Sequence, residues 1–115
     1  MQIEVGLNRD RIWHALMRQY PRAIGIVIDY GHTRRERSIG TWDAGTLVGY
    51  RNHRVTAPRL DGRTNVTAHV AIDALAAQAD EAHIMRLATW LGNEGDGLTT
   101  GALGDFPILL ARMRG

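Results

Sequence analysis

The sequence predicts an α/β fold, and three observations support this prediction. Residues 10–20 carry apolar side chains at the spacing of a helix, and Pro21 follows them. Residues 23–28 form an uninterrupted apolar run rich in β-branched residues, and residues 106–113 form a second apolar segment with the composition of a strand. A helix, a short turn and a buried strand make half of a βαβ unit, which indicates a sheet covered by helices.

Length and composition set the limits of this fold. A chain of 115 residues, 44% of them hydrophobic, can form one domain with a modest core. It contains no cysteine, which excludes disulfides and thiolate metal sites. No apolar run approaches the ~20 residues of a membrane span, and the first residues lack the features of a signal peptide. We therefore expect a cytoplasmic protein that does not use a membrane.

The first helix is expected to begin at Asp10, a residue type that caps helices, and to end before Pro21. Its predicted apolar face consists of Ile12, Trp13, Leu16, Met17 and Tyr20. The apolar run 23–28 is expected to be covered on both faces, as strands of parallel sheets are.

A long loop is predicted after this strand. Residues 31–65 are rich in Gly, Arg, Thr and Asn, and we expect them to be irregular, with one short ordered piece at 46–54. Residues 66–72 alternate between apolar and polar or small side chains. This pattern predicts a half-buried strand or an extended entry to a helix.

The C-terminal third is predicted to contain a helix and a strand. Residues 74–91 are Ala-rich and predict a helix, with an interruption near 79–81 and with Gly92 at its C-terminal end. Residues 106–113 predict the last strand, and Pro107 stands at its start, where a strand tolerates proline.

The charge is unevenly distributed, although the net charge is only +2. All 14 basic residues are arginine: residues 1–63 hold 11 of them against 6 acids (+5), and residues 64–115 hold 3 against 6 (−3). The basic half could attract an anionic partner. A solvated, arginine-rich face is the simpler explanation, and nucleic-acid binding is the weaker hypothesis because no aromatic platform accompanies the arginines.

Four residues of types that sites use directly follow the predicted buried strand: Asp29, Tyr30, Gly31 and His32. Ligands of open α/β sheets bind beyond the carboxyl ends of the strands. Asp29 can accept hydrogen bonds from a ligand, Gly31 can admit a ligand close to the backbone, and His32 can act as base or donor near neutral pH. The alternative is an Asx-turn that closes the strand, with a surface histidine.

A second candidate pair is Thr67 and His69. In an extended chain both project to one face, opposite the apolar residues of the same segment, and could reach the Asp29 end of the sheet. A structural hydrogen bond is the alternative for a lone histidine.

Other patterns argue against several kinds of site. The five histidines show no spacing typical of metal ligands. The segment Gly92–Gly97 has the order G-x-x-G-x-G after a predicted helix, whereas the dinucleotide fingerprint is G-x-G-x-x-G after a strand, so we expect a linker. The single serine, Ser38, is not part of a G-x-S-x-G nucleophile elbow.

Several segments together resemble one known family. In chain order they are Glu4-Val5, a helix that carries Trp13, Ile26–His32, Gly45–Val55, Asn65–Ala76 and Leu103–Leu110. The pattern is similar to the C-terminal half of the MidA-type S-adenosylmethionine-dependent methyltransferases. That family includes the mitochondrial complex I assembly methyltransferase, a protein arginine methyltransferase. The absence of lysine and the stretch DYGHTRRER resemble an actinobacterial member.

The resemblance implies the C-terminal part of a Rossmann-like class I methyltransferase sheet with flanking helices. The strand at 24–29 would be its fifth, and 106–113 the last, antiparallel strand beside it. The implied cofactor is S-adenosylmethionine, and the implied acceptor is a protein arginine or another nitrogen. Carried over residue by residue, the motifs imply a cleft bordered by Asp29, Tyr30, Gly31, Thr67 and His69, with His32 and Arg34 further out. Asp29 or His69 would orient or deprotonate the acceptor, and Tyr30 would shape the methyl-transfer channel.

The family's glycine-rich cofactor turn precedes the part that resembles this chain. We therefore expect residues 1–115 to be a single partial domain, a fragment or subunit of a methyltransferase whose partner is a protein substrate or the missing N-terminal half. The strand at 23–28 would then keep a bare edge, which favours self-association. The alternative function is a non-catalytic interaction or regulatory module that uses this sheet edge.

Overall fold

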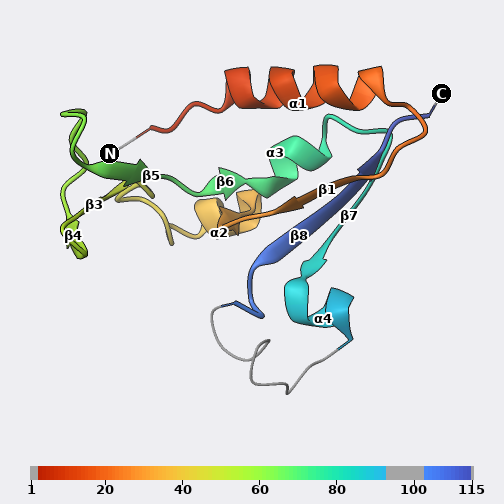
Figure 1. Cartoon of the computed structure of the whole chain (residues 1–115). Helices are drawn as coiled ribbons and strands as arrows, with labels where there is room; N and C mark the ends of the chain where they lie inside the picture. The colour runs from red at the N-terminus through yellow and green to blue at the C-terminus, as the bar shows by residue number, and fades with distance from the viewer. Residues whose placement is uncertain (1–2, 93–102, 115) are drawn as a thin grey trace.

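The computed structural model describes residues 3–92 and 103–114, which form four helices and three small sheets (Figure 1). The helices are α1 (Leu7–Gln19), α2 (Arg34–Ser38), α3 (Ile72–Ala76) and α4 (Leu87–Leu91). The strands are β1 (Gly25–Ile28), β2 (Gly31–His32), β3 (Val48–Arg51), β4 (Arg54–Thr56), β5 (Asn65–Thr67), β6 (Val70–Ala71), β7 (Glu81–Arg86) and β8 (Pro107–Arg112). Apart from Gly92, the predicted linker lies outside the described residues.

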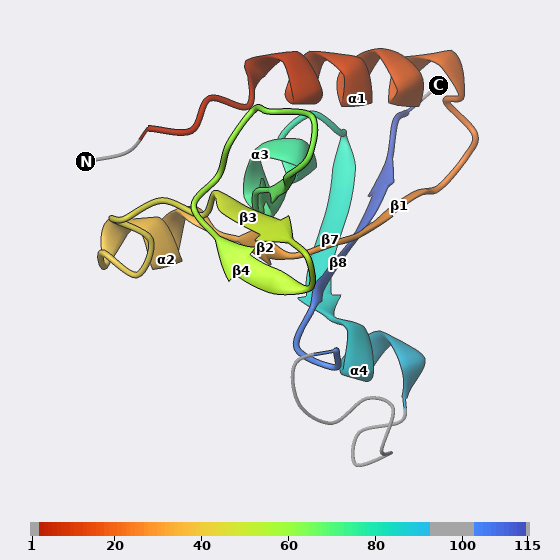
Figure 2. The same cartoon turned by 60° about the vertical axis from the view of Figure 1, so that its left-hand side comes forward.

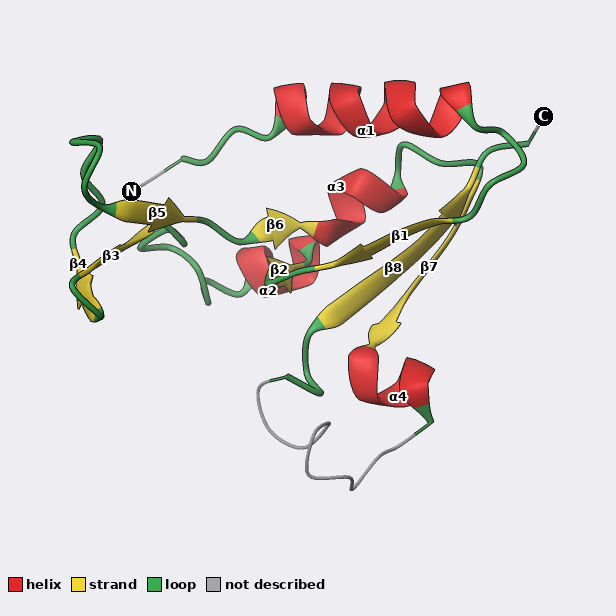
Figure 3. Cartoon of the chain, viewed as in Figure 1, coloured by secondary structure: helices red, strands yellow, loops and turns green. Residues whose placement is uncertain are grey.

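The main sheet consists of β1, β8 and β7 in that order, with β8 in the middle (Figure 3). Both pairings are antiparallel, and β1 pairs with β8 over all four of its residues. The prediction that segments 23–28 and 106–113 form antiparallel neighbouring strands is confirmed. Pro107 is the first residue of β8, as expected.

The hydrophobic core lies on one face of this sheet, where α1 lies over α3 (Figures 1 and 2). The core residues are Met17, Ile72, Leu75, Leu109, Ala111 and Met113, with Trp13 and Val27 packed against them. On β1 and the residue before it, the opposite face is open: Ile24, Ile26 and Ile28 are 65%, 49% and 48% exposed. The prediction that this strand is buried on both faces is wrong, because nothing in the described part of the chain covers its second face.

Helix α1 begins one turn before the predicted N-cap. Gly6 takes the cap position, and the N–H of Asp10 donates to the C=O of Gly6 at 3.0 Å. Asp10 lies in the first turn, where a carboxylate stabilises the helix dipole. The helix ends ahead of Pro21, as predicted. Only Met17 of the predicted apolar face is fully buried, and its exposed members are Ile12, Leu16 and Tyr20.

The single helix predicted over residues 74–91 is wrong, because the segment contains β7. The expected interruption near 79–81 is present, and the chain continues from it as a strand. β7 pairs with β8 over six residues, and the Glu81 carboxylate forms an ion pair with Arg112 of β8 at 2.5 Å. Alanine's helix propensity is a weak preference, which these cross-strand contacts outweigh. Gly92 closes α4 with a left-handed φ of 69°, as predicted.

The segment 31–65, expected to be irregular, contains β2, α2 and the β3–β4 hairpin. A capping box starts α2: the Thr33 hydroxyl oxygen accepts from the N–H of Glu36 at 3.4 Å, and the Glu36 carboxylate accepts from the N–H of Thr33 at 2.6 Å. The ordered piece expected at 46–54 overlaps β3 and reaches β4. Local capping and pairing therefore order much of what composition alone predicts as loop.

The strand predicted over 66–72 is divided into β5 and β6. β5 joins the small sheet β4-β3-β5, which Figure 2 brings forward, whereas β6 pairs in parallel with β2. Ala68 and His69 lie between the two strands. None of the helices in the described ranges is long and apolar enough to cross a membrane.

Candidate functional site

Two segments far apart in the sequence meet where β2 pairs with β6. Gly31 lies opposite Val70 and His32 opposite Ala71, and the N–H of Val70 donates to the C=O of Tyr30 at 2.8 Å. This short parallel pairing brings the two predicted motifs together at one place in the fold.

Gly31 is needed here for packing. A Cβ at this position would lie 2.9 Å from Cγ of Pro107 and 3.1 Å from the carbonyl oxygen of Val70. A larger residue would therefore separate β2 from β6. The close approach that the sequence suggested for a ligand is made by the protein itself.

An aromatic cluster surrounds His69 at this junction. The Tyr30 ring stacks on His69 with centroids 5.9 Å apart, and Trp42 meets the same imidazole edge-on at 4.5 Å. The His32 ring lies 6.3 Å from His69. His69 Nδ1 and Trp42 Nε1 are buried and have no hydrogen-bond partner among the described residues. A bound polar group could satisfy these two nitrogens.

A hydrogen-bond chain from Glu4 positions His69. The backbone N–H of His69 donates to the Thr46 hydroxyl oxygen at 2.9 Å, and that hydroxyl donates to the Glu4 carboxylate at 2.7 Å. The same carboxylate accepts the backbone N–H groups of Thr46, at 2.5 Å, and Leu47, at 3.2 Å. Burial opposes ionisation of Glu4, but the bonds from Thr46 and Leu47 lower its pKa overall. Glu4 is therefore a charged anchor for the loop that precedes β3.

His32 is buried and neutral. The guanidinium of Arg37 lies 2.8 Å from His32 Nδ1, and because arginine is only a donor, Nδ1 must accept. The proton of the neutral ring is then on Nε2. Burial lowers the pKa of His32, and the neighbouring Arg37 guanidinium and His69 imidazole lower it further. His32 can thus offer a hydrogen bond through Nε2, while its basic nitrogen is occupied.

Asp73 holds Arg37 in this position. Its carboxylate forms an ion pair with Arg37 at 3.2 Å and accepts the backbone N–H of Arg34, the first residue of α2, at 2.6 Å. Burial raises the pKa of Asp73, but these bonds to Arg34 and Arg37 lower it overall. Asp73 therefore ties α3 to the start of α2 and fixes the partner of His32.

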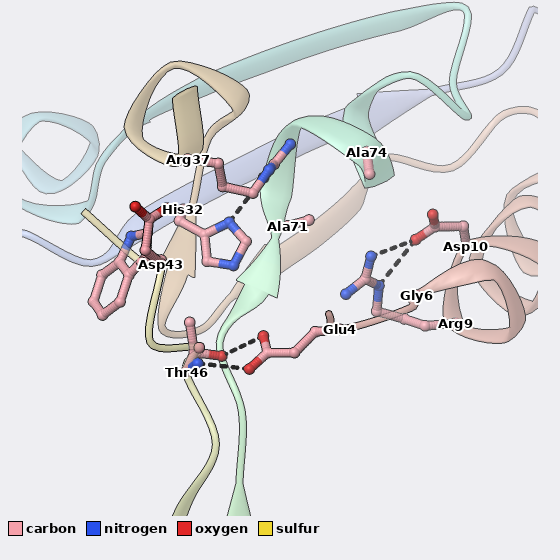
Figure 4. A pocket seen from close by; sticks show the side chains of 12 residues that line it. Glu4, Gly6, Arg9, Asp10, His32, Arg37, Asp43, Thr46, Ala71 and Ala74 are labelled. Atoms are coloured by element: carbon pink, nitrogen blue, oxygen red, sulfur yellow. Dashed lines mark hydrogen bonds and ion pairs between the residues drawn. The ribbon is translucent and has the colours of Figure 1, made fainter. Parts of the chain in front are cut away.

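A pocket of about 370 Å³, within the size range of ligand sites, is lined by Glu4, His32, Arg37, Trp42 and Thr46 among others. His69 lies beside it and lines a smaller hollow that Glu4 and His32 share. Figure 4 shows the Glu4–Thr46, His32–Arg37 and Arg9–Asp10 pairs around the pocket. Both arginines of its wall are paired with aspartates, Arg9 with Asp10 and Arg37 with Asp73. Asp43 adds an exposed carboxylate without an ion pair in the described part of the chain. The pocket wall therefore favours a cation.

The residues predicted from sequence divide into two groups. Tyr30, His32 and His69 come together in the aromatic cluster. The Asp29 carboxylate accepts the N–H of the next residue, Tyr30, at 2.8 Å, a local contact at the end of β1. Thr67 pairs with Val48 in the small sheet, and the side chain of Arg34 is exposed.

Sequence reasoning missed five residues of the site: Glu4, Arg37, Trp42, Thr46 and Asp73. One signal was available, because the Thr33–Glu36 capping box predicts a helix whose next residue is Arg37. The contacts of Glu4 with Thr46 and of Arg37 with Asp73 span 42 and 36 residues, and no local pattern reveals such pairs.

The site carries no grouping for a metal. Within the described ranges, no three His, Asp or Glu side chains lie close enough to hold an ion. In the same ranges, no strand leads through a glycine-rich turn into a helix, the arrangement that binds nucleotide-type cofactors.

A comparison with protein families finds one match. The model of the family described as "Putative S-adenosyl-L-methionine-dependent methyltransferase" matches residues 1–89, which include every residue of the cluster and the pocket. No curated protein and no solved structure matches the chain.

Proposed function

Because the chain belongs to this family of S-adenosyl-L-methionine-dependent methyltransferases, we propose that it forms the acceptor-binding part of a MidA-type enzyme that methylates nitrogen. The main sheet would be the end of a Rossmann-like class I methyltransferase sheet, with β1 as its fifth strand. The enzyme would work in the cytoplasm. The observation that carries the proposal is the pocket that joins His32, Trp42 and Thr46 to Glu4.

The proposed acceptor is the side chain of a protein arginine. Glu4 and Asp43 give the pocket wall negative charge; the oxygens of Glu4 already accept from Thr46 and Leu47, so the Asp43 carboxylate would pair with the guanidinium. The indole of Trp42 offers an aromatic face of the kind that attracts a guanidinium. With Arg9 and Arg37 neutralised by their own aspartates, no unpaired cation of the wall opposes such a ligand.

The cofactor supplies an activated methyl group, so the protein has to align the acceptor nitrogen and remove its proton. We assign this to His69, which lines the smaller hollow next to the pocket and whose buried Nδ1 lacks a partner among the described residues. His32, protonated at Nε2, would donate a hydrogen bond. Asp29 is the alternative base, and Tyr30 would hold the His69 ring from its other side.

The described residues do not fit the whole cofactor. They contain no glycine-rich turn that opens a helix, and arginine–aspartate pairs occupy part of the pocket wall. We therefore expect this chain to bind S-adenosylhomocysteine only together with a cofactor-binding half. Calorimetry should show no binding of S-adenosylhomocysteine to the chain alone, and binding after a cofactor-binding half is added.

Methyl transfer tests the function directly. The chain is mixed with the separately produced cofactor-binding half of a family member, radiolabelled S-adenosylmethionine and a peptide with one arginine. Label should enter this peptide but not the same peptide with lysine in place of arginine. His69→Asn should abolish the incorporation, whereas His83→Asn, a change of an exposed histidine outside the pocket, should leave it intact.

Two results would contradict the proposal. Equal incorporation by the His69→Asn variant would remove His69 from the chemistry. Cofactor binding by the mixture without labelling of any nitrogen would support a methyltransferase of another acceptor class. Binding of the arginine peptide to the chain alone, followed by Trp42 fluorescence in a variant without Trp13 and Trp90, examines the acceptor pocket independently of catalysis.

A further inference from the structure

The positive charge of the chain is concentrated in the β3–β4 hairpin (Figure 2) and the loop that follows it. Residues 48–67 hold four arginines against one acid, whereas the rest of the chain holds ten arginines against eleven acids. The four arginines are Arg51, Arg54, Arg59 and Arg63, and the acid is Asp61. The net positive charge of the chain therefore originates in this one segment, which can attract an anionic partner.

Two of these arginines lie directly opposite each other. Arg51 is the last residue of β3 and Arg54 the first of β4, and the register makes them a cross-strand pair. Like charges in this position repel and destabilise a hairpin. Asp61 compensates one of them through an ion pair with Arg51 at 3.6 Å, whereas Arg54 forms no ion pair within the described residues. An opposite charge at one of the two positions would stabilise the hairpin more, so the pair favours a ligand-binding role.

The backbone around the arginine pair is held in place. Asn52 and His53, the two turn residues, have positive φ angles of 50° and 60°, the conformation that fits the twist of a tight hairpin. The Asp61 carboxylate closes the following loop, because it accepts the N–H groups of Arg63 and Thr64 at 2.9 Å each. The arginines are thus presented by a short hairpin and a closed loop, whose backbone has little freedom to lose when a ligand binds.

The hairpin begins at the wall of the pocket. Thr46 lines the pocket, β3 starts two residues later at Val48, and Arg51 is five residues from Thr46. At about 3.3 Å per residue of extended chain, Thr46 and Arg51 are at most about 17 Å apart. An extended peptide with one side chain in the pocket would cover this distance with about five residues.

From these observations we propose that the hairpin arginines dock an acidic segment of the protein substrate, about five residues from the arginine that enters the pocket. The inference rests on the proposed function for the presence of that arginine. A carboxylate pairs with a guanidinium through two parallel hydrogen bonds, so Arg54 suits an aspartate or glutamate. Single-stranded nucleic acid fits less well, because its bases stack on aromatic side chains beside the basic groups. Tyr50, the one Tyr, Trp or Phe of residues 48–67, pairs with Val55 on the hairpin face opposite to the arginine pair.

Four labelled peptides test the docking by fluorescence anisotropy with the chain alone. Each carries arginine or alanine for the pocket, and three aspartates or three asparagines five residues away, on the N-terminal side in one set and on the C-terminal side in a second. In one of the sets, the asparagine peptides should bind roughly tenfold more weakly than the aspartate peptides. This difference should disappear in Arg54→Glu. It should remain in Arg22→Glu, the same charge reversal at an exposed arginine in the turn between α1 and β1.

The Arg54→Glu variant should fold at least as stably as the wild-type chain. Its carboxylate would face Arg51 as an opposite charge, so the midpoint of urea unfolding should stay equal or rise. A lower midpoint would overturn the proposal, because the arginine pair would then serve the fold.

Three further results would also overturn it. They are equal affinities of the aspartate and asparagine peptides in both sets, an equal loss of affinity in Arg22→Glu, and tighter binding of a single-stranded RNA that is lost in Arg54→Glu. Equal affinities of the arginine and alanine peptides would instead contradict the proposed function of the pocket, while the dependence on aspartate would still assign the acidic segment to the hairpin. None of these measurements requires methyl transfer.

Discussion

The carboxylate of Glu4 holds Thr46 at two points, accepting its backbone N–H at 2.5 Å and its hydroxyl at 2.7 Å. The hydroxyl oxygen in turn accepts the N–H of His69 at 2.9 Å. One residue near the start of the chain thus fixes the loop before β3 and, through it, the backbone of the central histidine. This arrangement leads to the first prediction.

Loss of the Glu4 charge should loosen this loop. Glu4→Gln keeps the size of the side chain, but it replaces one of the two carboxylate oxygens with a donor. We expect a loss of about 1.5–3 kcal/mol in the free energy of unfolding, the range of hydrogen bonds to a charged group. Hydrogen exchange of the Thr46 and His69 amides should also become faster.

A double-mutant cycle with Thr46→Val isolates the contact. Valine has the shape of threonine without the hydroxyl, so it removes the link to both Glu4 and His69. Because the two residues are in direct contact, the costs of the single changes should not add. Strict additivity would show that Glu4 and Thr46 stabilise the fold independently.

The buried His32 predicts a dependence of stability on pH. Its pKa is lowered in the folded chain, by burial first and then by Arg37 and His69. As pH falls below about 6.5, the unfolded chain takes up the proton before the folded chain does, so the native state loses stability. The contribution of neutral His32 to the free energy of unfolding is fully present above this pH. It declines as the pH falls toward the lower pKa that His32 has in the folded chain.

Urea unfolding at pH 7.5 and 5.5 measures this effect. The decrease in the free energy of unfolding from pH 7.5 to pH 5.5 should be smaller in His32→Gln than in the wild-type chain. The carboxyl groups of Glu4 and Asp73, whose pKa values are lowered below their ordinary acidic range, do not titrate in this window. An unchanged loss in the variant would show that His32 does not carry the dependence.

Asp73 should contribute more through the backbone of α2 than through its ion pair. The pair with Arg37 is about one-third exposed, so its coupling energy should be at most about 1 kcal/mol. Asp73→Ala also removes the acceptor of the Arg34 N–H and should cost about 1–2 kcal/mol in the free energy of unfolding. Comparison with Arg37→Gln in denaturant titrations separates the two contributions. A smaller loss for Asp73→Ala than for Arg37→Gln would reverse this order.

Gly25 should be intolerant of a side chain, because α1 packs directly on it. A Cβ at Gly25 would lie 2.5 Å from Met17 Sδ and 2.6 Å from the Trp13 ring. Gly25→Ala should therefore destabilise the fold by about 1–3 kcal/mol, as overpacking does. In a Met17→Ala background, where space is available, the cost should be smaller. Equal costs in thermal unfolding of the two backgrounds would show that Met17 is not the obstacle.

Local sequence patterns determined the elements whose signals are short in range. The apolar runs produced β1 and β8, Pro21 ended α1, and Gly92 closed α4 with a left-handed conformation. The motif residues Tyr30, His32 and His69 were also identified from residue type and position. In each case the residue's own chemistry or that of its neighbours specifies the conformation.

Only the tertiary structure decided the remainder. Residues 81–86 have helical propensity, yet they form β7 because β8 offers a partner edge and Arg112 an ion pair for Glu81. The site depends on Glu4 with Thr46 and Arg37 with Asp73, pairs whose members are 42 and 36 residues apart. Propensity and periodicity report the interactions of residues a few positions apart. Contacts across such separations become favourable only when the whole chain has folded, and for that reason the sequence by itself does not reveal them.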